Sequence, residues 1–171
     1  MCRIYLGVDQ SSNVSAYCVQ KGGKVLDYGS FQAGKKTDKP HIRINKLQTK
    51  LKELIDHWSP DEVIFEDVFK KGSITGFKTL AGCLAVCVNT CVSLGIEFSV
   101  VKASSWRKGF ITSKKRVDQK QEAIEKVNEL FNIKTDSDDE AEAILLSLYK
   151  TKEKKDGEKE LRKLIGKLPK S

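Results

Sequence analysis

Two short apolar segments of this chain end in acidic residues, and any fold must accommodate both. The first is IYLGVDQSS at residues 4–12, where apolar residues alternate up to Asp9 as in a half-buried strand. Gly7 lets another backbone or a phosphate come close to this strand. The second segment, VIFED at residues 63–67, has Glu66 near its end. One acid at a strand end is most often a turn or cap residue. Two strands with the same ending indicate a shared site.

The remaining patterns supply the elements that surround these two strands. Lys21-Gly22-Gly23 is a hairpin signal, so the first three strands form an antiparallel meander. A helix precedes the strand with Glu66, which therefore runs parallel to the first strand. We expect further strands over residues 14–20, 24–33, 62–66 and 96–101, and helices over residues 41–58, 73–94, 116–131 and from 136 onward. In the helix at 116–131 we expect the inward side chains to be Val117, Ile124, Val127 and Leu130.

This order predicts an α/β fold with a five-stranded mixed sheet, three antiparallel strands then two parallel, flanked by helices. It resembles the element order of the RNase H-like fold. We divide the chain into a nuclease domain of that kind at residues 1–150 and a basic C-terminal tail or helix at 151–171.

The composition fits one folded domain in a reducing compartment. A chain of 171 residues can bury about two thirds of its extended surface. The five cysteines have no CxxC spacing, and Cys83, Cys87 and Cys91 recur at helical spacing, which indicates small buried side chains. Only His41 and His57 could join them, which argues against zinc. Because no apolar window of 18 residues lacks polar interruption and no signal sequence opens the chain, we expect a cytoplasmic protein without a membrane partner.

The net charge of +8 indicates a polyanionic partner. Much of the excess lies in residues 150–171, which hold nine Lys or Arg against four Asp or Glu. The rest of the chain is only mildly basic and concentrates its acids in a few places. That distribution suits an enzyme acting on nucleic acid better than a general DNA coat.

A third group of acids lies in DSDDEAEAILL at residues 136–146. Asp139 and Glu142 are three apart and share a helix face. Capping by the first acids is the structural alternative, but it does not explain Glu142 one turn further along. Together with Asp9 and Glu66 these acids need cations, since like charges raise each other's pKa. Mg²⁺ or Mn²⁺ fits carboxylate ligands, and two ions about 4 Å apart would catalyse phosphodiester hydrolysis.

Taken together, these motifs resemble those of a RuvC-type Holliday junction resolvase, of the divergent kind encoded by bacteriophages. The likeness covers residues 4–149 and rests on GVDQSS, VIFEDVF, VKASSWRKGF with the later KK, and DDEAEAILL. It implies that two metal ions per active site are bound by Asp9, Glu66, Asp139 and Glu142, and that the chain serves DNA recombination and repair, in a bacterial host cell. Position 142 is Glu where the family more commonly has Asp, which puts the metal spacing in doubt.

The resemblance also implies a DNA-binding surface. Phe69, three residues after Glu66, matches an aromatic residue that stacks on bases, although an ordinary core Phe is the alternative. A turn after residue 101 and a later basic run supply candidates for phosphate contacts. The full set of candidate DNA-binding residues is Phe69, Lys70, Lys71, Lys102, Arg107, Lys108, Lys114 and Lys115.

A four-way junction has approximate two-fold symmetry, so a homodimer is expected. The small residues Gly76, Gly82, Cys83, Ala85 and Cys87 of one helix could form its interface or pack on the chain's own sheet. The sequence therefore predicts a Mg²⁺-dependent, structure-selective endodeoxyribonuclease acting on four-way junctions and other branched DNA. The alternatives are a non-cleaving branched-DNA binding module and a less selective RNase H-fold nuclease acting on flaps and forks. An actin-like ATPase lobe shares the strand motif, but the chain has no room for the second lobe.

Overall fold

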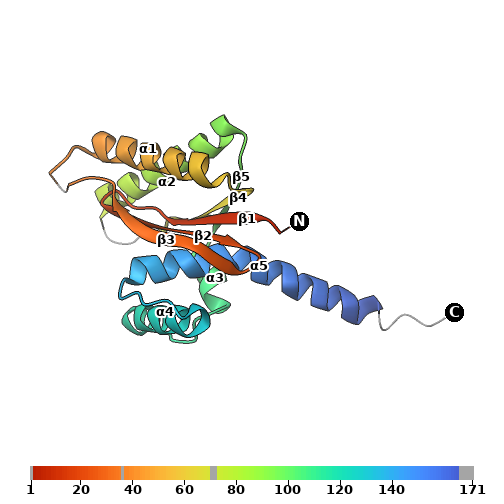
Figure 1. The fold of residues 1–171 in the computed structure, drawn as a ribbon. Coiled ribbons are helices and arrows are strands. Elements are labelled where there is room, and N and C mark those ends of the chain that lie inside the picture. The colour runs from red at the N-terminus through yellow and green to blue at the C-terminus, as the bar shows by residue number, and fades with distance from the viewer. Residues whose placement is uncertain (1, 36, 70–72, 166–171) are drawn as a thin grey trace.

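The computed structural model describes residues 2–35, 37–69 and 73–165, and of residues 153–165 only the backbone. Figure 1 shows its elements, which follow the predicted order. They are β1 (Ile4–Asp9), β2 (Val14–Lys21), β3 (Lys24–Gln32), α1 (Pro40–Trp58), β4 (Glu62–Glu66), α2 (Ile74–Leu94), β5 (Glu97–Val101), α3 (Ala103–Lys108), α4 (Arg116–Phe131) and α5 (Asp138–Ile165). The turn predicted after residue 101 is the short helix α3.

The five strands form one sheet in the order β3-β2-β1-β4-β5. β1 pairs antiparallel with β2 and parallel with β4, while β2–β3 is antiparallel and β4–β5 parallel. The predicted mixed sheet and its RNase H-like order are confirmed. β1 and β4 lie next to each other in the middle of the sheet, so the two acid-ending strands are neighbours.

Helices cover both faces of the sheet, α1 and α2 on one side and α5 with α4 on the other (Figure 1). Strand alternation divides the core accordingly. Leu6 and Val8 of β1 pack with the residues of α1 and α2, whereas Tyr5 packs with Ile144 of α5. Asp9 lies four residues after Tyr5 in the same strand, so both side chains point to the same face of the sheet, the face that α5 covers.

α5 crosses β1 at Gly7, where the two backbones come very close. A Cβ atom on Gly7 would lie 2.7 Å from the carbonyl oxygen of Ala143 and 2.7 Å from the amide nitrogen of Ser147. Glycine is therefore required here by space, as the sequence suggested. α5 continues to Ile165 beyond the body of the protein, so the predicted C-terminal segment is helical over residues 151–165.

Two inward positions predicted for α4 are wrong. Val117 is 78% exposed and Leu130 is 50% exposed, whereas Ala123 and Val127 are fully buried. The buried stripe of α4 faces α5 through Ala123, Val127 and Phe131. Val117 and Leu130 fall at the borders of that stripe, where an apolar residue gains little contact.

The cysteine face of α2 is buried as predicted, with Cys83, Cys87 and Cys91 free and inaccessible. Cys83 and Cys87 therefore serve the chain's own core, and Gly82 faces Ile44 of α1. In the described part of the chain, α2 is also the one helix long and apolar enough to cross a membrane by length and composition.

Candidate active site

The register of the central strands places Asp9 beside Glu66. Val8 of β1 is paired with Phe65 of β4 in the parallel ladder, so the next residues of the two strands are neighbours. Both acids line one pocket of about 660 Å³. We call it the acid pocket; its walls are Asp9, Gln10, Ser11, Glu66, Asp67, Val68, Phe69, Leu80, Lys102, Ala103, Ser104, Arg107 and Arg116.

The first turns of α5 bring Asp139 and Glu142 to the same region. Burial is the largest cause that raises the pKa of Asp9 well above its usual range, and the charges of Glu66, Glu142 and Asp139 raise it further. Burial also raises the pKa of Glu66 and, together with Asp138, that of Asp139. Acids from β1, β4 and α5 thus lie close enough for their charges to repel one another.

α3 supplies two donors to Glu66. Trp106 is fully buried, and its Nε1 donates a hydrogen bond of 2.8 Å to Oε2 of Glu66. Arg107 lies with its guanidinium 4.6 Å from the Trp106 ring, and its Nη2 is 3.2 Å from the same oxygen. Trp106 therefore orients the carboxylate of Glu66, one of the two acids that line the pocket.

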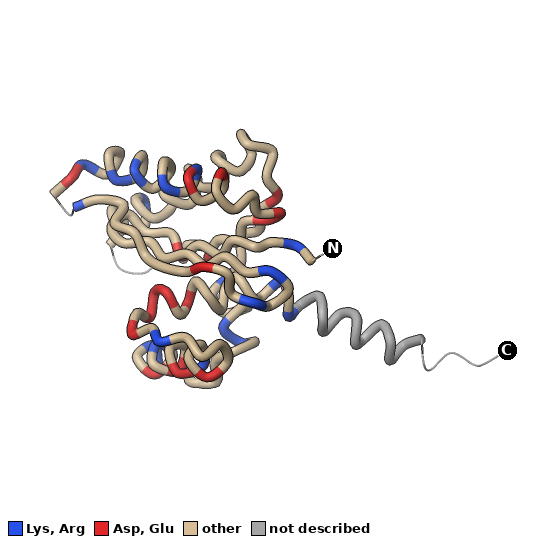
Figure 2. Tube along the Cα trace, viewed as in Figure 1, with Lys and Arg blue, Asp and Glu red and all other residues tan. Residues whose placement is uncertain are grey.

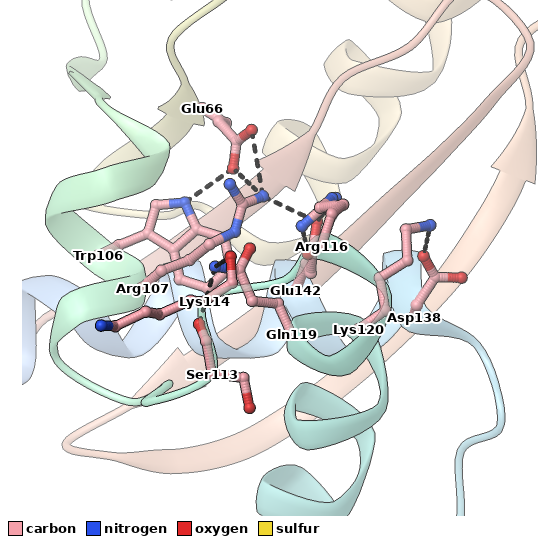
Figure 3. Close-up of polar contacts among 10 residues, drawn as sticks. All are labelled: Glu66, Trp106, Arg107, Ser113, Lys114, Arg116, Gln119, Lys120, Asp138 and Glu142. Atoms are coloured by element: carbon pink, nitrogen blue, oxygen red, sulfur yellow. Dashed lines mark hydrogen bonds and ion pairs between the residues drawn. The ribbon is translucent and has the colours of Figure 1, made fainter.

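Glu142 is held by two guanidiniums, as Figure 3 shows. Nη2 of Arg107 donates to Oε2 of Glu142 at 3.1 Å. Arg116 donates from both terminal nitrogens: Nη2 to Oε2 at 2.9 Å, and Nη1 to Oε1. Glu142 is 3% exposed. The sequence interpretation missed Arg116, because its place after Lys114-Lys115 marks it only as part of a basic run and not as a partner of Glu142.

Gln10 is another residue that the sequence interpretation missed. Its side chain is 5% exposed and its Nε2 donates to the carbonyl oxygen of Glu66 at 2.5 Å, which ties the ends of β1 and β4 together. Both its Oε1 and Nε of Arg107 are buried and have no hydrogen-bond partner among the described residues. Buried polar atoms of this kind are costly unless a ligand or water satisfies them.

The predicted DNA-binding residues differ in their surroundings. Phe69 is 86% exposed on the wall of the acid pocket, so the core alternative for it is wrong. Lys102 is exposed at the same pocket, and Lys108, Lys114 and Lys115 are exposed as well. Arg107 instead contacts Glu66 and Glu142, and its predicted role in phosphate binding stays a prediction. Lys70 and Lys71 lie outside the described residues. Figure 2 shows basic residues of the described part spread over several elements.

Hydrogen bonds hold the basic loop before α4 in place. Glu122 accepts from the amides of Thr112 and Ser113, both at 2.8 Å. The side chain of Ser113, followed by these two amides, lowers the pKa of the Glu122 carboxyl to about 2. Gln119 donates to the carbonyl oxygen of Ser113 at 2.9 Å (Figure 3). The backbone just before Lys114 is therefore fixed relative to α4.

The model of the crossover junction endodeoxyribonuclease RuvC family matches residues 5–149 of this chain. The chain belongs to the RuvC family. This RuvC domain spans the whole sheet, and its match ends at residue 149, within α5. A search of curated protein sequences finds no significant match.

Solved structures agree with the RuvC assignment at the level of the fold. Thermus thermophilus RuvC in complex with Holliday junction substrate has a TM-score of 0.75 and 12% identity, covering 91% of this chain and 96% of that one. The fowlpox virus resolvase in complex with Holliday junction DNA has a TM-score of 0.62 and 15% identity, covering 88% and 97%. The yeast mitochondrial Holliday junction resolvase has a TM-score of 0.61 and 14% identity, covering 86% and 77%.

The donor chemistry of this RuvC site fits a hard divalent cation. Asp9 and Glu66 offer carboxylate oxygens to the acid pocket. Burial raises the pKa of both and neighbouring acids add to it, so a cation bound there would stabilise the ionised carboxylates. As the side chains stand, no three Asp, Glu, His or Cys residues of the described chain converge closely enough to hold a metal ion. Figure 3 shows Arg107 between Glu66 and Glu142, in contact with both.

Proposed function

We propose that this chain is a metal-dependent, structure-selective endodeoxyribonuclease that resolves four-way DNA junctions by phosphodiester hydrolysis, with Mg²⁺ as the metal and Mn²⁺ able to replace it. One observation carries the proposal. Asp9 and Glu66 end neighbouring parallel strands and line one pocket in a chain of the RuvC family.

Asp9, Glu66 and Asp139 are the residues that we propose to hold the metal. Two bound ions would activate a water molecule on one side of a phosphodiester and stabilise the leaving 3′ oxygen on the other. The chain's own residues prepare this site. Gln10 links the two strand ends and Trp106 orients Glu66, so the carboxylates keep their relative positions before any ligand binds.

The rim of the acid pocket supports DNA as the substrate. Phe69 is exposed where it could stack on a base, and such stacking tolerates any sequence. Lys102, Lys108, Lys114 and Lys115 are exposed cations that we propose to contact phosphates, together with Lys70 and Lys71. Two of the similar structures are complexes with Holliday junction DNA, which supports a branched substrate.

We also propose that the active form is a homodimer joined through α2. Opposite its buried cysteine face, this helix exposes Ile74 (60%), Val92 (61%) and, between them, Ala85. These positions share one stripe of the helix. An exposed apolar stripe of this kind suits an isologous contact, which would set two active sites against the two strands to be cut. Light scattering with and without junction DNA tests this, and a monomer in both conditions contradicts it.

The test of the function compares the parent chain with Asp9→Asn and Glu62→Gln on synthetic four-way junctions and on linear duplex, with Mg²⁺ or with EDTA. Glu62 is a suitable control because it is 4% exposed and lies at the opposite end of β4 from Glu66. We expect junction cleavage in Mg²⁺ by the parent and by Glu62→Gln, and at least 1,000-fold slower cleavage by Asp9→Asn, on the order of the loss when catalytic groups are removed.

Two results would contradict different parts of the proposal. Equal cleavage by Asp9→Asn and the parent removes the assigned metal site. Equal cleavage of duplex and junction by the parent leaves a nuclease but removes junction selectivity.

A further inference from the structure

Glu142 differs from the other acids of the site in what surrounds it. Asp9 and Glu66 line the acid pocket, whereas Glu142 is 3% exposed and lies behind two guanidiniums. Arg116 contacts both of its oxygens, and Arg107 contacts Oε2 as well. Both carboxylate oxygens are therefore already occupied by cationic donors.

A buried carboxylate that is held by two guanidiniums is hard to free from them. Bidentate guanidinium–carboxylate pairs are among the strongest hydrogen-bonded contacts in proteins, and removal of one partner leaves an uncompensated buried charge. To bind a metal ion, Glu142 would have to release at least part of these contacts. The simplest state of the site keeps Glu142 with Arg116 and Arg107.

The two arginines, in contrast, face the ligand space. Both line the acid pocket together with Asp9 and Glu66. Glu142 fixes the position of each guanidinium, and Nε of Arg107 has no hydrogen-bond partner in the part of the chain that the structure describes. A guanidinium held in this way is preorganised for a phosphate, which it recognises through paired donors.

We propose that Glu142 is a positioning residue that holds Arg107 and Arg116 on the pocket wall, where they bind the phosphodiester of the DNA, and that Glu142 is not a ligand of the metal. This inference rests on the proposed nuclease function and gives Glu142 a role different from the one implied by family resemblance. Position 142 is Glu where the family more commonly has Asp, and in this chain that Glu contacts both arginines.

The first experiment measures Mn²⁺ binding by calorimetry without DNA, on the parent, Asp9→Asn, Glu142→Gln and the buried control Glu62→Gln. We expect Asp9→Asn to lose at least about tenfold in Mn²⁺ affinity, because it removes a ligand. Glu142→Gln and Glu62→Gln should stay within about threefold of the parent. A loss in Glu142→Gln equal to that in Asp9→Asn overturns the proposal.

The second experiment is a double-mutant cycle on four-way junction affinity in EDTA, with Arg116→Met made in the parent and in Glu142→Gln. We expect Arg116→Met to weaken binding about tenfold in the parent, as for one charge-assisted contact, and to lower the salt slope by about 1. In the Glu142→Gln background its effect should be less than about threefold, because Arg116 is no longer held there. The cycle cancels the direct effect of removing a carboxylate near DNA. Equal effects of Arg116→Met in both backgrounds overturn the positioning role.

If circular dichroism shows that Glu142→Gln does not fold, the variant Arg116→Met alone decides the question. In that variant Glu142 still has its ion pair with Arg107, so its carboxylate is not left without a cationic partner. If Glu142 were a ligand competing with Arg116, this variant would bind Mn²⁺ more than tenfold tighter; we expect a change below threefold. The cycle needs neither metal nor cleavage. A parent chain that fails to cut junctions in Mg²⁺ therefore refutes the proposed function without deciding the role of Glu142.

Discussion

The backbone of α5 comes very close to β1 at Gly7, and the substitution Gly7→Ala tests whether that contact positions the active site. The added Cβ would lie 2.7 Å from two backbone atoms and 2.8 Å from Cβ of Ser147. Ordinary contact begins at 3.4 Å, so α5 must move by about 0.7 Å. Because backbone cannot rotate away, we expect a cost at the upper end for an overpacked core, about 3 kcal/mol.

That cost corresponds to a melting temperature about 6–12 °C below that of the parent. The movement also displaces Asp139, one turn before Ala143, relative to Asp9. A displacement approaching 1 Å costs up to about 100-fold in rate, so junction cleavage at a temperature where both proteins are folded should fall by about 10- to 100-fold. Urea unfolding gives the free energy of unfolding, and cleavage assays give the rate.

Gly29→Ala is the matched control, because Gly29 is also a strand glycine and its added Cβ would first meet a ring atom of Tyr17 at 3.4 Å. We expect this variant to change the free energy of unfolding by less than about 1 kcal/mol, in the usual range for a substitution without a clash. A Gly7→Ala protein as stable and as active as Gly29→Ala would show that α5 does not depend on the close approach to β1, and the reasoning would be refuted.

Three further substitutions probe the site. Since burial raises the pKa of Asp9, the stability of the metal-free parent falls as pH rises above the unfolded pKa of about 3.9. Asp9→Asn should therefore melt higher than the parent at pH 7 in EDTA, and the difference should vanish below about pH 4. Trp106→Phe removes the hydrogen bond to Glu66 and should lower the free energy of unfolding in urea by about 1.5–3 kcal/mol. Glu122→Gln loosens the loop at Ser113 and should weaken junction binding in a mobility-shift assay by about three- to fivefold, within the span of one net hydrogen bond.

Each of these has a clear contrary result. Identical melting of Asp9→Asn and the parent at pH 7 would mean that the Asp9 carboxylate carries no electrostatic cost. An unchanged free energy of unfolding in Trp106→Phe would mean that the indole is not needed to hold Glu66. Unaltered junction affinity in Glu122→Gln would show that the loop before α4 does not contribute to binding.

Local patterns account for what could be predicted of the fold. Period-two alternation around Leu6 and Val8 and helical spacing of the cysteines depend on residues close in the chain, so the elements and their order could be derived. The parallel pairing of β1 and β4 followed from connection rules, and it was enough to put Asp9 beside Glu66. The same patterns failed for Val117 and Leu130, because the width of a buried stripe depends on the partner helix.

The cations around the acids could not be predicted in the same way. Arg107 and Arg116 are separated by eight residues of loop and helix, and both reach Glu142 on a third element. Nothing in their spacing distinguishes a guanidinium that contacts a carboxylate from one that points into solvent. Gln10 gave no signal either, since its partner is a backbone carbonyl on β4.

The sequence by itself determined the α/β architecture, the two acid-ending strands and the acids of α5, because each depends on short-range periodicity or on general rules of connection. Only the tertiary structure decided that Glu142 lies behind two arginines while Asp9 and Glu66 face the pocket. That choice depends on how closely α5 approaches β1 at Gly7, on where α3 ends and on where α4 begins, and these distances between remote segments are set by packing.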